Sequence, residues 1–386
     1  MKRILFVSNG HGERAIADRI AAEVRDISDF EIDHLALVGE GRSPNMRDVG
    51  PQRSMPSGGL IAMGNARNIA RDLRAGLAAL TIAQHRFLRG LRGRYALTVA
   101  VGDVFAFVMA RTCKAPVAFV GTAKSVRVAP YGPMEERLLR SARGVFVRDG
   151  ETAERLRADG VAAESLGNAI VDLFAREAEL APDAAFAPFD PLLVLLPGSR
   201  ANAYADARFL AGVVRDVARR RPGLGAAISI APGLDAGRFA AEFSGDGWSV
   251  ALDGDALLPF TLRDGERTLV RAWSGPVGAL FGRAKLVLGQ AGTANEAAAA
   301  AGVPIVAFRI GDERKDGWYR RRQQSLLGDG LTVLPGNAEE AAAGVAALLD
   351  DETRRTRMGA VGRERMGPPG GSRAIAERVA ALAGEA

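Results

Sequence analysis

The sequence predicts an α/β protein with two doubly wound, parallel-sheet domains, and three observations support this fold class. Short apolar runs of strand length recur along the chain, for example at residues 4–8, 96–101, 192–196 and 285–288. Each run is followed by a glycine-rich or polar loop and then by a stretch with helical periodicity, the order expected of parallel βαβ units. The length of 386 residues is enough for two cores of ordinary size.

The composition is that of a soluble globular protein and favours an anionic partner. Charged residues make up 25% of the chain and the net charge is +6. A basic excess suits a phosphate-bearing substrate, an anionic membrane or nucleic acid, but nucleic acid is disfavoured because the basic residues are scattered with few interleaved aromatics. The single cysteine, Cys113, excludes an internal disulfide and fits a reducing cytoplasm. No apolar run reaches the roughly 18 residues that span a bilayer.

We expect the first domain to cover residues 1–180 and the second to cover residues 190–365. Residues 177–191 are rich in Ala, Asp and Pro and have little periodicity, which is typical of a linker. In the second domain, further strands are expected near 226–230, 248–252 and 268–272, with helices between them. A last helix in 366–386 is expected to pack back onto the first domain.

The strand at 285–288 begins the most informative unit of the second half. After it, Thr293 is the predicted N-cap of an alanine-rich helix, Glu296 has capping-box spacing, and Gly302 ends the helix. The free amides of such a helix N-terminus suit a diphosphate. Gly292 would let the backbone approach the phosphates, and Glu296 would bind a ribose diol. The alternative is that these residues only cap the helix, and the spacing alone favours neither interpretation.

A second motif, Leu-Pro-Gly-Ser-Arg at residues 196–200, follows the first strand of the second domain. Gly198 and Ser199 offer backbone amides and a hydroxyl at the end of that strand. Arg200 offers a planar guanidinium that can bind a diphosphate. The alternative for Arg200 is a surface ion pair.

In the first domain, the loop after residues 4–8 reads Asn-Gly-His-Gly-Glu. Gly10, Gly12 and Ala15 fit the dinucleotide-binding fingerprint. Glu13 would repel a diphosphate, whereas His11 and Glu13 could both contact a sugar hydroxyl. The alternative for His11 is an exposed loop residue.

Asp103 ends the apolar run at 96–101, where ligands meet side chains in a parallel sheet. It either caps the helix that begins near Phe105 or faces the ligand cleft. Its apolar neighbourhood predicts that desolvation raises its pKa.

Residues 60–91 combine apolar side chains with arginines, of which Arg67, Arg71 and Arg74 share one helical face. A basic amphipathic helix of this kind can lie on an anionic bilayer. The alternative is a surface helix whose basic face is solvated.

Taken together, these motifs resemble those of the lipid A disaccharide synthases, which are UDP-sugar glycosyltransferases with the GT-B fold of two Rossmann-like domains that face a cleft. The match comprises Gly292-Thr293-Ala294, Glu296-Ala297, Gly302-Val303-Pro304 and residues 196–200. It is weaker in the first half, where the family's Gly-Glu-x-Ser-Gly-Asp and Asp-x-x-Asp-Phe segments are altered.

The resemblance implies an inverting, metal-independent transfer of a sugar, for example an N-acetylhexosamine, from UDP to a lipid, with no cofactor. Asp103 is then the expected general base, with His11 and Glu13 as alternatives or as groups that orient the acceptor. It also implies a cytoplasmic protein bound peripherally to the inner face of the plasma membrane through Arg67, Arg71 and Arg74. The expected donor-binding residues are Gly198, Ser199, Arg200, Gln290, Gly292, Thr293, Glu296 and Gln323.

Two other functions remain open. A non-hydrolysing UDP-sugar 2-epimerase has the same fold but needs no lipid acceptor. A catalytically inactive module that binds UDP-sugar or membrane is the third possibility.

Overall fold

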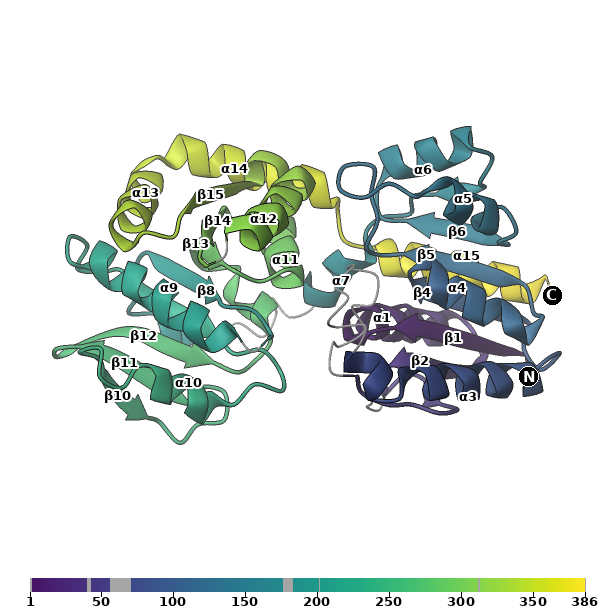
Figure 1. Ribbon diagram of the computed structural model, residues 1–386. Coiled ribbons are helices and arrows are strands. Elements are labelled where there is room, and N and C mark those ends of the chain that lie inside the picture. The colour runs from purple at the N-terminus through teal and green to yellow at the C-terminus, as the bar shows by residue number, and fades with distance from the viewer. Residues whose placement is uncertain are drawn as a thin grey trace. The chain divides into compact units, whose positions relative to one another are not determined.

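The structure, a computed structural model, describes residues 2–39, 43–55, 71–175, 183–200, 202–311 and 313–385. The chain forms two compact units (Figure 1). The first unit contains Met1–Leu173 together with Pro369–Ala386, and the second contains Phe174–Pro368. In the described residues, each unit has a mostly parallel sheet with helices between most of its strands, which confirms the predicted α/β class.

The first unit has a parallel sheet in the order β3-β2-β1-β4-β5-β6-β7. Its strands are β1 (Arg3–Asn9), β2 (Glu31–Val38), β3 (Arg47–Asp48), β4 (Leu97–Gly102), β5 (Val117–Gly121), β6 (Gly144–Val147) and β7 (Ala163–Glu164). From β1 the sheet extends through β2 to β3 on one side, and from β4 it extends through β5 and β6 to β7 on the other side. The carboxyl ends of β1 and β4 therefore lie side by side at a topological switch point, with Ser8 paired to Val101.

Helices cover both faces of this sheet, with α3, α4 and α5 on one face and α1 and α15 on the other (Figure 1). The helices of this unit are α1 (His11–Ile27), α3 (Leu77–Gly90), α4 (Val104–Ala110), α5 (Pro133–Leu139), α6 (Gly150–Ala158) and α15 (Gly371–Gly384), with a 3-10 turn at Arg111–Cys113. Helix α7 (Ala169–Ala175) begins in the first unit, and its last two residues belong to the second. The last helix, α15, packs against α1. The Asp172 carboxylate accepts the backbone N–H groups of Gly370 and Ser372 at 2.6 Å each and so caps α15.

The basic segment predicted over residues 60–91 is not one helix in its described part. Gly76 has a φ of 94°, in the left-handed region, and serves as the N-cap of α3. Glycine adopts this conformation readily, so the chain turns there before α3 begins at Leu77.

The described part of the second unit has an eight-stranded sheet in the order β10-β11-β12-β9-β8-β13-β14-β15. They are β8 (Leu192–Leu196), β9 (Gly225–Ser229), β10 (Ser249–Leu252), β11 (Phe260–Asp264), β12 (Arg267–Trp273), β13 (Ala284–Gly289), β14 (Ile305–Arg309) and β15 (Leu331–Pro335). The expectation of helices between all strands is wrong for β10, β11 and β12, which pair antiparallel. Asp264 pairs with Arg267 across a two-residue turn in which Gly265 has a φ of 61°, so no helix fits there.

The helices of the second unit pack against one another as well as against the sheet. Helix α9 contacts α10 and α13, and α14 contacts α11, α12 and α13. The helices are α8 (Asp183–Phe186), α9 (Ala203–Ala218), α10 (Ala236–Glu242), α11 (Thr293–Ala301), α12 (Glu313–Leu327), α13 (Ala338–Asp350) and α14 (Glu352–Met366), with 3-10 turns at Val277–Leu280 and Gly328–Gly330. Among the described residues, no helix is long and apolar enough to cross a membrane.

Part of the predicted linker belongs to the second core. Phe186 and Phe189 are both buried, and the Phe186 ring lies 6.3 Å from the ring of Trp273. The Arg271 guanidinium donates a hydrogen bond to the Ala185 carbonyl at 2.6 Å. The described residues from 183 onward therefore pack on the second sheet, because their two phenylalanines bury apolar surface there.

Candidate functional site

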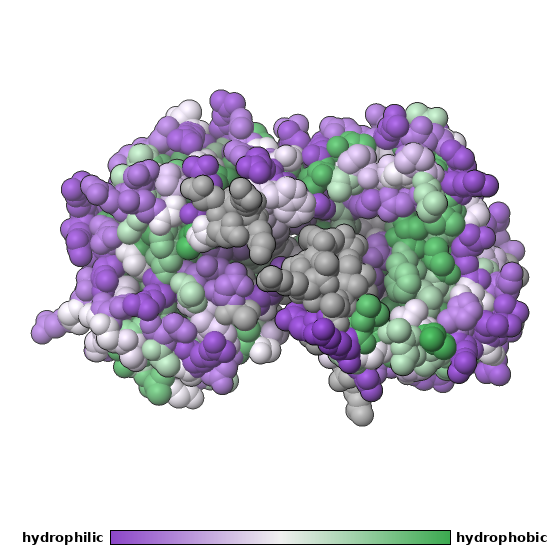
Figure 2. Space-filling model, in the orientation of Figure 1, coloured by the Kyte–Doolittle hydropathy of each residue, from purple (hydrophilic) through white to green (hydrophobic). Residues whose placement is uncertain are grey.

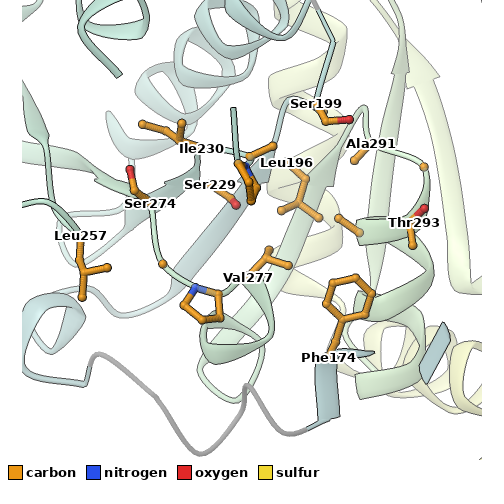
Figure 3. Close-up of a pocket in the computed structure, with 17 residues that line it drawn as sticks. Phe174, Leu196, Ser199, Ser229, Ile230, Leu257, Ser274, Val277, Ala291 and Thr293 are labelled. Carbon is orange, nitrogen blue, oxygen red and sulfur yellow. The ribbon is translucent and has the colours of Figure 1, made fainter. Parts of the chain in front are cut away.

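The second unit contains a cavity of about 590 Å³ at the carboxyl ends of its parallel strands. Figure 3 shows Ser199, Ala291 and Thr293 on one side of this cavity and Ile230, Leu257 and Ser274 on the other. None of the described lining residues is charged, and the hydroxyls of serines and Thr293 together with backbone groups supply the polar atoms. The lining residues are Phe174, Leu196, Gly198, Ser199, Ser229, Ile230, Ala231, Pro232, Leu257, Ser274, Gly275, Pro276, Val277, Ala291, Gly292, Thr293 and Ala294.

The structure brings the two predicted donor motifs together in one wall of the cavity. The backbone N–H groups of Gln290 and Ala291 both donate to the Leu196 carbonyl, at 2.8 and 3.1 Å. Gly198 has a φ of 106°, and a Cβ atom there would lie 4.0 Å from the Cα of Ala291. The loop after β8 and the loop after β13 therefore support each other through backbone contacts.

The predicted N-cap at Thr293 is wrong, because the cap is Gly292 and the helix begins at Thr293. Gly292 makes no side-chain capping hydrogen bond. A Cβ atom on Gly292 would lie 2.9 Å from the Tyr319 hydroxyl, so a larger residue would disturb that contact. Thr293 lines the cavity, and Glu296 lies partly buried in the first turn of α11 outside the lining.

Gln290 and Gln323 are both predicted to bind the donor, and in the structure the side-chain amide of each binds protein groups. Gln290 donates to the Phe308 carbonyl at 3.1 Å and accepts the Phe308 N–H at 3.2 Å. Gln323 donates to the Ala291 carbonyl at 2.7 Å and accepts from the Arg320 guanidinium at 2.8 Å. These two glutamines fix the loop that precedes α11.

The Arg200 carbonyl accepts the Ala203 N–H at 2.8 Å, but its exposed side chain forms no ion pair or hydrogen bond with a residue that the structure describes. It lies near Tyr319, which was not among the predicted site residues. Burial raises the pKa of the Tyr319 phenol, while the charges of Arg320 and Arg200 oppose that rise. The aromatic pair at residues 318–319 was visible in the sequence, but only the contact with Gly292 shows that Tyr319 reaches the α11 N-terminus.

A second cluster of candidate residues lies in the first unit, at the switch point between β1 and β4. Asp103 is the N-cap of α4, and its Oδ1 accepts the Ala106 N–H at 3.0 Å. Its Oδ2 accepts a hydrogen bond from the Asn9 side-chain amide at 2.9 Å. The expectation of an apolar, desolvated Asp103 is therefore wrong, because polar groups from two elements bind both carboxylate oxygens. Within the described residues, the buried Oδ1 of Asn9 has no partner.

Glu13 is the carboxylate that burial affects most strongly in this cluster. Burial raises its pKa to about 7, the charge of Asp103 adds to this effect, and a hydrogen bond from its own backbone N–H opposes it. His11 is the first residue of α1, and its side chain lies outside the described set.

A buried polar network that the sequence did not indicate lies beside this cluster. His34 bridges Ser8 and Asp48, with its Nε2 2.9 Å from the Ser8 Oγ and its Nδ1 2.9 Å from Asp48 Oδ1. Arg14 of α1 donates to both oxygens of Asp48 at 3.0 and 2.9 Å. Ser8 and His34 are fully buried, so this network supports the loop after β1 rather than meeting a substrate.

The three arginines predicted for membrane contact are only partly described. Arg67 lies outside the described residues, whereas Arg71 and Arg74 are exposed just before α3.

No protein-family model and no curated protein sequence matches the chain. Among solved structures, it is similar to UDP-GlcNAc 2-epimerase from Neisseria meningitidis bound to UDP-GlcNAc, with 13% identity and a TM-score of 0.63 over 98% of this chain and 99% of that one. Phytolacca americana UGT2, complexed with UDP-2fluoro-glucose and pterostilbene, is 12% identical with a TM-score of 0.62 over 100% of both chains. MurG from Acinetobacter baumannii is 14% identical with a TM-score of 0.58, again over 100% of both chains. The chain therefore has the GT-B fold of these structures.

Proposed function

We propose that this chain transfers a sugar, for example an N-acetylhexosamine, from a UDP-sugar to a lipid acceptor at an anionic membrane surface. The observation that carries the proposal is the cavity where the loops after β8 and β13 meet the N-terminus of α11. Two proteins with the same fold were solved with UDP-sugars bound, UDP-GlcNAc in one and UDP-2fluoro-glucose in the other. These structures support a UDP-sugar as the ligand of this cavity.

The chemistry of the cavity suits a nucleotide diphosphate sugar. Its uncharged serine and backbone groups can bind a nucleoside and sugar hydroxyls. The Asn295 and Glu296 N–H groups donate to the Gly292 carbonyl, whereas the Thr293 and Ala294 N–H groups have no acceptor among the described residues. The helix dipole also favours an anion at that end. Arg200, exposed at the end of the Pro-Gly-Ser-Arg loop, adds a guanidinium for the diphosphate. As the sugar leaves, these groups would stabilise the growing charge on UDP without a metal ion.

In the first unit, Glu13 is the better candidate for general base. Its pKa of about 7 suits proton transfer at neutral pH, whereas both oxygens of Asp103 already accept hydrogen bonds. In the proposed step, the acceptor hydroxyl attacks the anomeric carbon and its proton passes to Glu13. The bond from that carbon to the diphosphate oxygen breaks, and its electron pair leaves with UDP. Direct displacement inverts the configuration.

The helical face made by α3, α4 and α5 supports a lipid acceptor. Exposed apolar side chains occur on all three helices, namely Ile82 on α3, Phe105 and Val108 on α4, and Met134 on α5. Figure 2 shows hydrophobic residues gathered over α4. The outer face of α3 also carries basic residues that would bind anionic headgroups.

The proposed membrane contact is tested by sedimentation with vesicles. Binding to anionic vesicles should fall steeply as salt rises, and replacing Arg86 and Arg89 with Gln should reproduce that loss. Arg357→Gln, an exposed change on α14 of the second unit, is the control. Equal binding to neutral and anionic vesicles would exclude the electrostatic contribution.

The proposed reaction is tested with UDP-N-acetylglucosamine and a membrane lipid extract, with mass analysis of the products. A new glycolipid that forms only with the wild-type protein, and not with Glu13→Gln, is the expected result. Bound UDP-sugar without any product in the presence of lipids would instead indicate a binding module.

A second candidate function is a UDP-sugar 2-epimerase. The N. meningitidis 2-epimerase matches this fold over 98% of the chain, which favours this alternative. Incubation with UDP-N-acetylglucosamine alone separates the two functions, because an epimerase converts the sugar without an acceptor and a transferase does not.

A further inference from the structure

Tyr319 on α12 lies over the first residues of α11. A Cβ atom on Gly292 would lie 2.9 Å from the Tyr319 hydroxyl oxygen, so the phenol approaches the helix cap closely. Within the described residues, this hydroxyl has no hydrogen-bond partner. A polar group therefore reaches the position where the first-turn amides of α11 point out of the helix.

Two buried neighbours hold α12 in this position. The Arg320 guanidinium lies 5.3 Å from the centre of the Tyr319 ring and donates to Gln323. Gln323 in turn donates to the carbonyl of Ala291, the residue before Gly292. Arg320 and Gln323 are both more than nine-tenths buried. The position of Tyr319 relative to Gly292 is thus fixed by a chain of contacts rather than by the tyrosine alone.

The electrostatic surroundings of Tyr319 suit an anionic ligand. The positive charges of Arg320 and Arg200 lower the pKa of the phenol, whereas the negative charge of Glu296 raises it. Because burial raises its pKa, the phenol keeps its proton at neutral pH and is a hydrogen-bond donor. A charged acceptor placed there would receive a hydrogen bond from a pre-positioned side chain.

We propose that the Tyr319 hydroxyl donates a hydrogen bond to the terminal phosphate of a nucleoside diphosphate held at the α11 N-terminus, and that Gln323 positions the loop beneath it. This inference rests on the proposed function, because the cavity bordered by Gly292 and Thr293 would hold that nucleotide. Tyr319, and not the Gln323 expected from the sequence, is then the residue of α12 that contacts the donor.

Titration calorimetry with UDP and UMP tests the proposal. Tyr319→Phe should weaken UDP binding about tenfold or more, because a hydrogen bond to a charged group is lost, while UMP binding stays within about twofold. Tyr204→Phe is the matched control, since the Tyr204 hydroxyl accepts the Asp235 N–H elsewhere in the second unit. Unchanged UDP affinity in Tyr319→Phe, or an equal loss for UDP and UMP, would overturn the inference.

The contact with Gly292 allows a second, independent test. Gly292→Ala places a methyl group against the Tyr319 hydroxyl, so its effect on UDP affinity should be smaller when Tyr319 is already Phe. Additive effects of the two substitutions would contradict the proposed contact. If the wild-type protein binds neither nucleotide, the proposed function itself fails. If it binds both and the tyrosine variant behaves like wild type, only this inference fails.

Discussion

The side chain of Glu13 lies directly against the backbone of Gly102, with its Cγ 2.8 Å from the position of a Cβ atom on that glycine. Gly102 has a φ of 124°, which L residues rarely adopt, so both the conformation and the contact require glycine. Because Gly102 precedes Asp103, this contact holds the two carboxylates in one cluster. Glu13 is thus half-buried beside a like charge; desolvation raises its pKa, and the charge of Asp103 adds to that rise.

Glu13→Gln should stabilise the protein at neutral pH while it lowers turnover by about 10²–10⁴-fold. A carboxyl with a pKa of about 7 in the folded state and about 4.5 when unfolded costs stability as pH rises between these values. One pKa unit corresponds to about 1.4 kcal/mol, so the gain from Gln should grow to at most roughly 3 kcal/mol at pH 7 and then level off.

Urea unfolding of wild type and Glu13→Gln from pH 4.5 to pH 8 measures this gain. Glu151→Gln is the control, because Glu151 is exposed and paired with Arg127 on the surface. A stability difference between the wild-type protein and the Glu13→Gln variant that does not change with pH would contradict the raised pKa.

His34 should make the protein less stable in mild acid. Burial lowers its pKa below 6.5, although hydrogen bonding to Asp48 opposes the shift. Below pH 6.5 the unfolded chain therefore binds a proton that the folded chain does not, and stability falls as pH falls through this range. His34→Gln, which keeps polar atoms between Ser8 and Asp48, should flatten the fall.

The measurement is the free energy of unfolding at pH 7.5 and pH 5.5 for both proteins. His85→Gln is the control because His85 is exposed. If wild type and His34→Gln lose the same stability between the two pH values, the destabilisation comes from other groups.

The parallel sheets could be predicted because their signal is local. The run at residues 192–196 and the run at 285–288 are apolar, and the glycines after each mark the turn where the strand ends. Carboxyl ends of parallel strands share one edge of a sheet, so the meeting of the two loops at Leu196 follows from the fold. The strand β11 was missed because its antiparallel pairing depends on the turn at Gly265 and not on a βαβ pattern.

The roles of the glutamines could not be predicted from spacing. Gln290 pairs with the backbone of Phe308, 18 residues away, and Gln323 binds the carbonyl of Ala291, 32 residues away. Such long-range contacts decide whether an amide is available to a ligand, and only the folded chain reveals them. The same holds for Glu13, whose burial depends on the distant Gly102.

Gln323→Leu should weaken UDP binding several-fold, because the buried Ala291 carbonyl loses its donor and the loop before α11 is no longer fixed. The adjacent, exposed Gln324 offers a matched control, and Gln324→Leu should leave UDP affinity within about twofold. Calorimetric titration of UDP measures both. A loss in Gln324→Leu that equals the loss in Gln323→Leu would indicate a general effect on α12.

Two glycines of α14 should be essential for the packing that supports the nucleotide site. A Cβ atom on Gly359 would lie 2.3 Å from the Gly302 carbonyl oxygen, and one on Gly362 would lie 2.8 Å from the Ala299 oxygen. Both contacts are with α11 or its C-cap, and the N-terminus of α11 borders the cavity.

Gly359→Ala should destabilise the protein by about 1–3 kcal/mol, because the overpacking outweighs the gain of about 1 kcal/mol in helix propensity. Gly212→Ala, in α9 with nothing within 4 Å of the new methyl group, should be neutral or stabilising by up to about 1 kcal/mol. Thermal and urea unfolding compare the two variants, and a stabilised Gly359→Ala would show that α14 can move away from α11 at little cost.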